Sequence, residues 1–306
     1  MAPTVTVTFI RHGESTDNLR NVWAGWKDSP LSNHGMNATK ALGKSLSHIR
    51  FTAIHASPLK RALWTAQAVH DAQQEPQPPL TTSPLLREQH WGIAEGNPWI
   101  MQFKPGLTLE EHYARNLYPV LPDRSQKFPE GESLDDLAQR AKQAINDIVM
   151  PYVWQAVKTG EKGTHIALVS HGLCISELVP ALLCKDVSGI HPGHKYRGLL
   201  NTAWARITIN VKGAKEGEAL AFIDSNPPPL EIRVVDFNSH DHLDDMKGGI
   251  GSAQFDPKQQ SIRAFFGGGG GDADLEEGRS ESNVRDEVDV EVQDEDTLTA
   301  KEAQKL

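Results

Sequence analysis

The sequence predicts an α/β protein, a three-layer α/β/α sandwich with a mostly parallel central sheet, followed by a disordered C-terminal tail. Short apolar segments alternate with amphipathic ones along the first 237 residues, which favours a parallel sheet between two layers of helices. Residues 165–170 are apolar at almost every position, as in a strand that is covered on both faces. After residue 238, glycine and acidic residues replace the apolar ones, and such a segment cannot offset its ordering entropy.

Two strand–helix units are predicted in the first part of the chain. Residues 5–10 alternate in polarity and predict a strand that ends at Arg11-His12-Gly13. Ser32 is a typical N-cap for the helix that follows it. A strand over residues 51–55 leads to Ser57-Pro58, which indicates a cap and a first-turn proline at the start of a second helix.

Further elements complete the predicted sandwich. Residues 80–88 are expected to hold another short strand, and residues 91–129, broken by five prolines, to form a lid or loop insertion. Ser133 predicts the start of an amphipathic helix. The remaining elements are a strand, a helix and two strands, at residues 165–170, 173–183, 204–211 and 230–237. We therefore expect one catalytic domain over residues 1–237 and a tail over residues 238–306.

Composition excludes several classes of function. The net charge of −9 and the pI near 5.8 lack the basic character of a protein that binds nucleic acid through its phosphates. The N-terminus has neither the basic flank nor the apolar stretch of a signal peptide, and no apolar segment is of membrane-spanning length. Cys174 and Cys184 are expected to be buried, reduced thiols. These features favour a soluble protein of the cytoplasm or the nucleus.

Two loops carry the residues that suggest chemistry. Ile10-Arg11-His12-Gly13 and Val169-Ser170-His171-Gly172 each place a histidine at the end of a strand, followed by glycine. Ligands of parallel sheets bind beyond the carboxyl ends of the strands. Together with Arg61 and Glu88, the loops predict a pocket of two imidazoles, two guanidiniums and a carboxylate, and guanidiniums match phosphate oxygens in pairs.

Several segments, in order along the chain, resemble the histidine phosphatase superfamily, which includes the cofactor-dependent phosphoglycerate mutases. The resemblance covers residues 4 to 210. Its segments are Arg11-His-Gly-Glu-Ser-Thr-Asp-Asn18, Asn21-Val-Trp-Ala-Gly-Trp-Lys-Asp-Ser-Pro-Leu-Ser32, Ser57-Pro-Leu-Lys-Arg-Ala62, Glu88-Gln-His-Trp-Gly92, Pro129-Glu-Gly-Glu-Ser133 and Val169-Ser-His-Gly172. It implies a phosphoglycerate mutase-like fold.

The resemblance also implies roles for individual residues. His12 is expected to attack phosphorus and become phosphohistidine, while Arg11, Arg61 and His171 hold the phosphoryl oxygens. Glu88 is expected to give a proton to the leaving oxygen and later to activate water. Further substrate contacts are implied for four residues, Asn18, Ala24, Gly25 and Gly172. No metal is expected, and the only cofactor would be 2,3-bisphosphoglycerate, if the enzyme is a mutase.

The sequence favours a phosphomonoester phosphatase over a mutase. Mutases hold the carboxylate of phosphoglycerate with a neighbouring pair of arginines and a longer lid. Between Trp91 and Glu130, Arg115 and Arg124 stand apart and the segment is shorter. We expect a less sealed pocket that admits water to the phosphohistidine. Phosphoglycerate mutase is the alternative.

A motif in the tail suggests a function of another class. Gln259, Ile262, Phe265 and Phe266 have the spacing by which many proteins bind the replication sliding clamp. One helical turn would gather the aliphatic and aromatic side chains of residues 259–266 into an apolar plug. The alternatives are that the aromatic residues dock on the enzyme itself or that the match is accidental.

Overall fold

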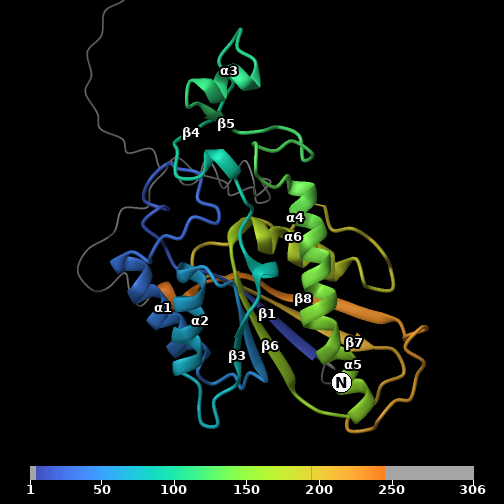
Figure 1. Ribbon diagram of the computed structural model, residues 1–306. Helices are drawn as coiled ribbons and strands as arrows, with labels where there is room; N and C mark the ends of the chain where they lie inside the picture. Colours follow the sequence, from blue (N-terminus) through green and yellow to red (C-terminus); the bar gives the residue numbers. More distant parts are fainter. Residues whose placement is uncertain (1–4, 194, 245–306) are drawn as a thin grey trace, which may run out of the picture. The chain divides into compact units, whose positions relative to one another are not determined.

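A six-stranded sheet forms the centre of the computed structural model, which describes residues 5–193 and 195–244 (Figure 1). Its order is β3-β2-β6-β1-β7-β8. The strands are β1 (Val5–Arg11), β2 (Ala53–Ala56), β3 (Leu80–Thr82), β6 (Thr164–Ser170), β7 (Trp204–Val211) and β8 (Leu230–Ser239). The first four in the order run parallel, and β7 and β8 are joined antiparallel. The predicted three-layer α/β/α sandwich with a mostly parallel sheet is confirmed.

Two helices cover one face of the sheet. They are α1 (Asn33–Leu46) and α2 (Lys60–Asp71), which pack on each other. Beneath them lies a cluster of buried apolar side chains that includes Ile10, Ile54 and Val169. Ser32 caps α1 as predicted, because its hydroxyl accepts a hydrogen bond from the backbone N–H of Gly35 at 2.9 Å.

The helices on the opposite face form the larger layer. They are α4 (Leu134–Ala144), a π-helical turn η3 (Ile145–Val149), α5 (Met150–Thr159) and α6 (Gly172–Leu183). They pack against Val7, Phe9 and Leu168, which alternate with the residues of the other face. The α4, η3 and α5 segments follow one another without a break, so the helical region that starts after Ser133 continues to Thr159.

The segment predicted to be a lid has short elements of its own. They are η2 (Gly92–Ala94), β4 (Trp99–Ile100), α3 (Leu109–Ala114) and β5 (Tyr118–Pro119). β4 and β5 pair in parallel as a small second sheet. Figure 1 draws β4, β5 and α3 together, above the six-stranded sheet. Trp23, Trp91 and Phe128 form the centre of a separate aromatic core in this region.

Three local predictions differ from the structure. Residues 80–88 form only the three-residue strand β3, after which Pro84–Leu86 makes a 3-10 turn, η1. α2 begins at Lys60 rather than after Ser57, because the Ser57 backbone N–H still bonds to the Val169 carbonyl oxygen and continues the strand edge. Cys174 is buried, but Cys184 is exposed because it follows the last turn of α6.

Two other predictions concern regions at or beyond the end of the described chain. The motif of Gln259, Ile262, Phe265 and Phe266, like the rest of the tail after residue 244, lies outside the described residues. β8 continues to Ser239, and a short turn, η4 (Asp241–Leu243), follows it. None of the helices in residues 5–193 and 195–244 is long and apolar enough to cross a membrane.

Candidate active site

The pairing of β1 with β6 brings the two histidine loops together. The strands are parallel, with Arg11 opposite Ser170, and the His12 N–H donates to the Ser170 carbonyl oxygen at 3.0 Å. The ring centroids of His12 and His171 are 4.9 Å apart, and both side chains are buried. The two imidazoles that the sequence predicted for one pocket therefore lie side by side.

The tautomer of His12 follows from its hydrogen bond. Its Nδ1 lies 2.6 Å from the carbonyl oxygen of Gly13. A carbonyl can only accept, so Nδ1 carries the proton, and in the neutral ring the lone pair is on Nε2. Behind the ring, the His12 carbonyl oxygen accepts from the Thr202 N–H at 3.2 Å and from Asn201 Nδ2 at 3.1 Å. These contacts fix the backbone that carries the imidazole.

His171 is held as a neutral imidazole. Burial lowers its pKa well below the ordinary value, and the nearby Arg61, His12, Arg11 and Arg140 lower the pKa further. Its Nε2 is 2.8 Å from the hydroxyl of Ser57. Within the described residues, Nδ1 of His171 is buried and has no hydrogen-bond partner. A buried nitrogen of this kind is suited to a polar group of a ligand.

The two arginines are fixed by backbone carbonyls. Arg61, on the first turn of α2, is 1% exposed, and its Nη2 donates to the Gly25 carbonyl oxygen at 2.7 Å. Burial lowers the pKa of Arg61, while Glu88, Asp28, Asp17 and Glu95 act in the opposite direction. Arg11 Nη1 donates to the Leu199 carbonyl oxygen at 2.5 Å. A guanidinium stays protonated in such surroundings, so both arginines bring positive charge to the site.

Glu88 lies at the N-terminus of α6. Its Oε1 accepts from the backbone N–H of Cys174 at 3.0 Å and of Gln89 at 3.0 Å, and its Oε2 accepts from that of Leu173 at 3.2 Å. The carboxyl group therefore takes bonds from the first turn of the helix that starts after His171. This contact links the residue predicted as proton donor to the second histidine loop.

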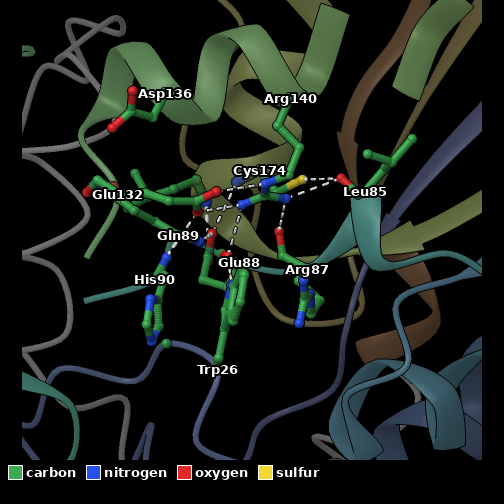
Figure 2. Close-up of polar contacts among 12 residues, drawn as sticks. Trp26, Leu85, Arg87, Glu88, Gln89, His90, Glu132, Asp136, Arg140 and Cys174 are labelled. Carbon is green, nitrogen blue, oxygen red and sulfur yellow. Dashed lines mark hydrogen bonds and ion pairs between the residues drawn. The ribbon is translucent and has the colours of Figure 1, made fainter. Parts of the chain in front are cut away.

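A partly buried arginine that was not predicted as a site residue holds the Glu88 segment in place (Figure 2). Arg140, on α4, donates to the carbonyl oxygens of Leu85 at 3.0 Å, Arg87 at 2.7 Å and Glu88 at 3.0 Å. Its remaining bonds go to the Glu132 carboxylate, at 2.8 and 2.6 Å. Glu132 belongs to the segment Pro129-Glu-Gly-Glu-Ser133 quoted above, which was the signal available in the sequence.

The loop that meets Arg61 is organised by a second carboxylate. Glu95 accepts from the backbone N–H groups of Trp26 at 2.7 Å, Lys27 at 2.6 Å and Trp91 at 3.1 Å. The indole N–H of Trp26 donates to the Glu88 carbonyl oxygen at 2.6 Å. The Gly25 carbonyl, the Glu88 backbone and the aromatic region are thereby joined in one network.

A cavity of about 160 Å³ opens beside these groups. Of the residues predicted to contact substrate, Arg11, Asn18, Ala24, Glu88 and Gly172 line it. The other four, His12, Gly25, Arg61 and His171, are not among its lining residues. Each is adjacent in sequence or hydrogen-bonded to a residue close to the cavity: His12 follows Arg11, His171 precedes Gly172, Gly25 follows Ala24, and Arg61 bonds to Gly25.

Asn18 has a structural role as well as a place at the cavity. Its Oδ1 accepts from the Ser15 N–H at 3.0 Å and from the Ser15 hydroxyl at 3.1 Å, and Asn201 Nδ2 lies 3.4 Å away. The amide oxygen thus stabilises the turn after His12, and only the Nδ2 group of Asn18 is suited to donate to an anion. Among the described residues, no group of three or more His, Cys, Asp or Glu side chains is placed to hold a metal ion.

Comparison with known sequences and structures agrees with this geometry. A protein of Schizosaccharomyces pombe named as a probable phosphatase is 30% identical over 268 residues, covering 85% of this chain and 79% of its own. The 2,3-bisphosphoglycerate-dependent phosphoglycerate mutase 2 of Lactobacillus johnsonii is 30% identical over 200 residues, 60% of this chain and 83% of its own.

Solved structures show the same fold. A mycobacterial glucosyl-3-phosphoglycerate phosphatase superimposes with a TM-score of 0.53 at 22% identity, over 76% of this chain and 98% of its own. The family model of the histidine phosphatase superfamily (branch 1) matches residues 7–216, a range that contains both histidine loops, Arg61, Glu88 and Arg140. This chain belongs to branch 1 of the histidine phosphatase superfamily, whose phosphatase-named relatives mark it as an enzyme acting on phosphate esters.

Proposed function

We propose that the protein is a phosphomonoester phosphatase that hydrolyses a small phosphorylated metabolite through a phosphohistidine at His12. The observation that carries this proposal is the bond from His12 Nδ1 to the Gly13 carbonyl oxygen at 2.6 Å. It leaves the lone pair on Nε2 of a ring that lies 4.9 Å from His171. A fixed, neutral imidazole among cationic side chains is suited to nucleophilic attack on a phosphate ester.

In the first step, the Nε2 lone pair of His12 attacks phosphorus and the bond from phosphorus to the ester oxygen breaks. Arg11, Arg61 and the unpartnered Nδ1 of His171 hold the phosphoryl oxygens and stabilise their charge. The protonated carboxyl group of Glu88 gives its proton to the departing oxygen, which leaves as the alcohol.

In the second step, water attacks the phosphohistidine. The Glu88 carboxylate takes one proton from that water as the new P–O bond forms and the P–N bond breaks. Inorganic phosphate and neutral His12 result, with Glu88 protonated again. The backbone bonds that Glu88 receives from Gln89, Leu173 and Cys174 keep the carboxyl group at the cavity through both steps.

The charges of the lid support hydrolysis over mutase activity. Of the lid residues 91–129, Trp91 and Trp99 line the cavity, and no arginine or lysine of that described segment does. Arg124 is engaged elsewhere, with Glu177 at 3.0 Å, and Arg115 is exposed. A mutase must retain a phosphorylated acid long enough to return the phosphoryl group to it. A lid that brings no positive charge to the cavity does little to retain such an acid.

The proposal is tested by trapping the intermediate. We expect ³²P from a labelled phosphomonoester to appear on the protein as an acid-labile, alkali-stable adduct after rapid quenching. His12→Ala should abolish the adduct and lower kcat by roughly 10⁴-fold or more. His34→Ala, which alters an exposed histidine on α1, is the matched control and should retain both. Normal turnover by His12→Ala would overturn the proposal.

A second assay separates phosphatase from mutase. With 3-phosphoglycerate and a trace of 2,3-bisphosphoglycerate, we expect little isomerisation and, with p-nitrophenyl phosphate, steady release of phosphate. Fast isomerisation without phosphate release would instead show a phosphoglycerate mutase, with 2,3-bisphosphoglycerate as its cofactor.

We also propose that the tail binds the sliding clamp through Gln259, Ile262, Phe265 and Phe266, which implies a nuclear location. The support is the spacing of these residues in the sequence. A peptide of residues 256–267 titrated into the clamp should give measurable heat of binding. The same peptide with both phenylalanines replaced by alanine should give none, because the two aromatic anchors are lost. Equal heats from the two peptides, or none from either, would rule out this proposal.

A further inference from the structure

Apolar side chains make up a large part of the cavity lining. Val22, Trp23, Trp91, Trp99, Leu173 and Leu199 contribute to it. Trp23 is held by its indole N–H, which donates to the Tyr118 carbonyl oxygen at 3.1 Å, and the Trp99 backbone N–H bonds to the Asn21 carbonyl oxygen at 3.1 Å. These bonds hold the Trp23 indole and the Trp99 backbone, and the indole and aliphatic surfaces of the walls suit an apolar group.

The size of the cavity also fits a single ring. The whole cavity, including the space beside Arg11 and Glu88, has a volume of about 160 Å³. A protein cavity of about 150 Å³ with aliphatic and aromatic walls takes up benzene, so no more than one ring fits beside the phosphoryl group. A ring bound in the cavity would leave water and contact the tryptophan side chains, which favours binding. Stacking of the ring on an indole strengthens binding further.

The charges at the cavity oppose an acidic leaving group. Arg11 and Arg20 are its only cationic lining residues in the described chain. Arg11 is one of the groups assigned to the phosphoryl oxygens. Arg20 forms an ion pair with Asp17, and the Arg20 side chain is 65% exposed while that of Asp17 is 6% exposed.

Asp17 is itself a lining residue. The Asp17 carboxylate is buried beside the cavity, whereas the compensating Arg20 side chain lies mostly in solvent, where its charge is screened. A carboxylate on the leaving group would meet the like charge of Asp17, and the second cation of the lining, Arg20, is already paired with Asp17. Asn18, Asn21 and Ser176, which also line the cavity, are neutral and suit hydroxyl groups.

From these walls and charges we infer that the enzyme selects phosphomonoesters of neutral alcohols that carry a ring, and discriminates against phosphorylated carboxylic acids. The inference rests on the proposed phosphatase activity and adds the class of its substrate. In this inference Arg11 serves the phosphoryl group, while the apolar walls and the neutral polar side chains serve the alcohol and Asp17 disfavours a second negative charge.

A matched pair of substrates tests the inference. Benzyl phosphate and 4-carboxybenzyl phosphate have leaving groups of similar reactivity and differ in one carboxylate. We expect kcat/KM for benzyl phosphate to exceed that for 4-carboxybenzyl phosphate by ~10-fold or more. We expect a similar advantage over glycerol 3-phosphate, which lacks the ring. Equal rates within the pair, or a preference for 3-phosphoglycerate or phosphoserine, would overturn the inference.

Two variants with opposite expected effects test whether Asp17 and Arg20 cause the discrimination against 4-carboxybenzyl phosphate. Asp17→Asn removes the negative charge and releases Arg20, so the discrimination against 4-carboxybenzyl phosphate should fall. Arg20→Gln leaves Asp17 uncompensated, so that discrimination should rise. The measured quantity is the ratio of kcat/KM for benzyl phosphate to kcat/KM for 4-carboxybenzyl phosphate. If both variants leave this ratio unchanged, or shift it in the same direction, the role of the Asp17–Arg20 pair is contradicted.

The contact between Trp99 and the substrate ring is tested by a separate variant. Trp99→Ala should raise KM for benzyl phosphate by ~10-fold and leave KM for glycerol 3-phosphate nearly unchanged. Equal changes for both substrates would show that Trp99 does not contact the ring. Failure of the inference remains distinct from failure of the proposed function, because the ³²P adduct at His12 forms with either class of ester. If no ester of any kind labels His12, the proposed function itself fails.

Discussion

Arg140 Nη2 donates a hydrogen bond to the carbonyl oxygen of Glu88 at 3.0 Å. The same side chain bonds to the carbonyl oxygens of Leu85 and Arg87 and to the Glu132 carboxylate. One guanidinium from α4 thus fixes the backbone that carries the Glu88 carboxyl group. Arg140 itself is not among the described residues that line the cavity. We regard Arg140 as a positioning residue.

Replacement of Arg140 should impair the proton transfer proposed for Glu88. In Arg140→Met the three carbonyls lose their donor, so we expect kcat to fall by ~10²-fold, as for a reacting group displaced by about 1 Å. Arg140→Lys, which keeps the charge but not the planar fork, should recover only part of the rate. The measurement is the pH profile of kcat. Its alkaline limb, where a proton donor is lost, should shift in the Arg140 variants.

Lys142 provides a control on the same helix. It is an exposed residue of α4, and Lys142→Met should leave kcat and its pH profile unchanged. If Arg140→Met lowered stability alone and kept the wild-type kcat and pH profile, Arg140 would be a purely structural residue.

Gly25 should tolerate no side chain. A Cβ atom there would lie 2.1 Å from Glu95 Oε1 and 2.9 Å from the Gln89 carbonyl oxygen. Because the Gly25 carbonyl receives the Arg61 guanidinium at 2.7 Å, a shift of this loop also moves Arg61. We expect Gly25→Ala to lower the free energy of unfolding by about 1–3 kcal/mol and to lower kcat/KM, as measured by urea titration and steady-state kinetics.

A double-mutant cycle distinguishes this clash from a general effect of alanine. In the Glu95→Ala background the nearest atom is gone, so Gly25→Ala should cost less there than in the wild type. Additive costs of the two substitutions would show that the Glu95 carboxylate is not what excludes a side chain from position 25.

Stability should decrease as the pH falls below about 6.5, the ordinary pKa of histidine. Burial lowers the pKa of His165 and of His242 to about 4, and burial among cations lowers that of His171 well below its ordinary value. Between these values the unfolded chain binds protons that the folded chain does not, so the free energy of unfolding declines with falling pH. The decline should continue until the folded-state pKa values are reached.

Urea titrations at a series of pH values between 7 and 4 measure this dependence. His165→Gln should reduce the proton uptake on unfolding by about one proton. A stability that is constant over this range would contradict the neutral, buried state of these histidines.

The sequence was sufficient for the features that depend on periodicity and on motifs. The strand before His12 and the one before His171 were both predicted, and their pairing as neighbours brings the two rings together. The N-cap at Ser32 was predicted from residue type alone, and its hydrogen bond is present. Such features are local or follow from a general rule of parallel sheets, so one sequence can indicate them.

Other features depend on contacts between distant residues. Arg140 lies on a polar stretch of an amphipathic helix, where an arginine is normally exposed, but it bonds to carbonyl oxygens 52 to 55 residues away. Ser57 was interpreted as a helix cap, but its hydroxyl bonds to His171, 114 residues further on. No local pattern reports pairings over such separations.

The register of β1 against β6, with Arg11 opposite Ser170, restricts where the chain can change in length. Successive residues of a strand point to opposite faces, so a single inserted residue in either strand would turn one imidazole away from the other. The lid segment, with its own small sheet of β4 and β5, is not bound by that register. Insertions and deletions there can reshape the side of the cavity lined by Trp91 and Trp99 while the distance between the two imidazoles is preserved.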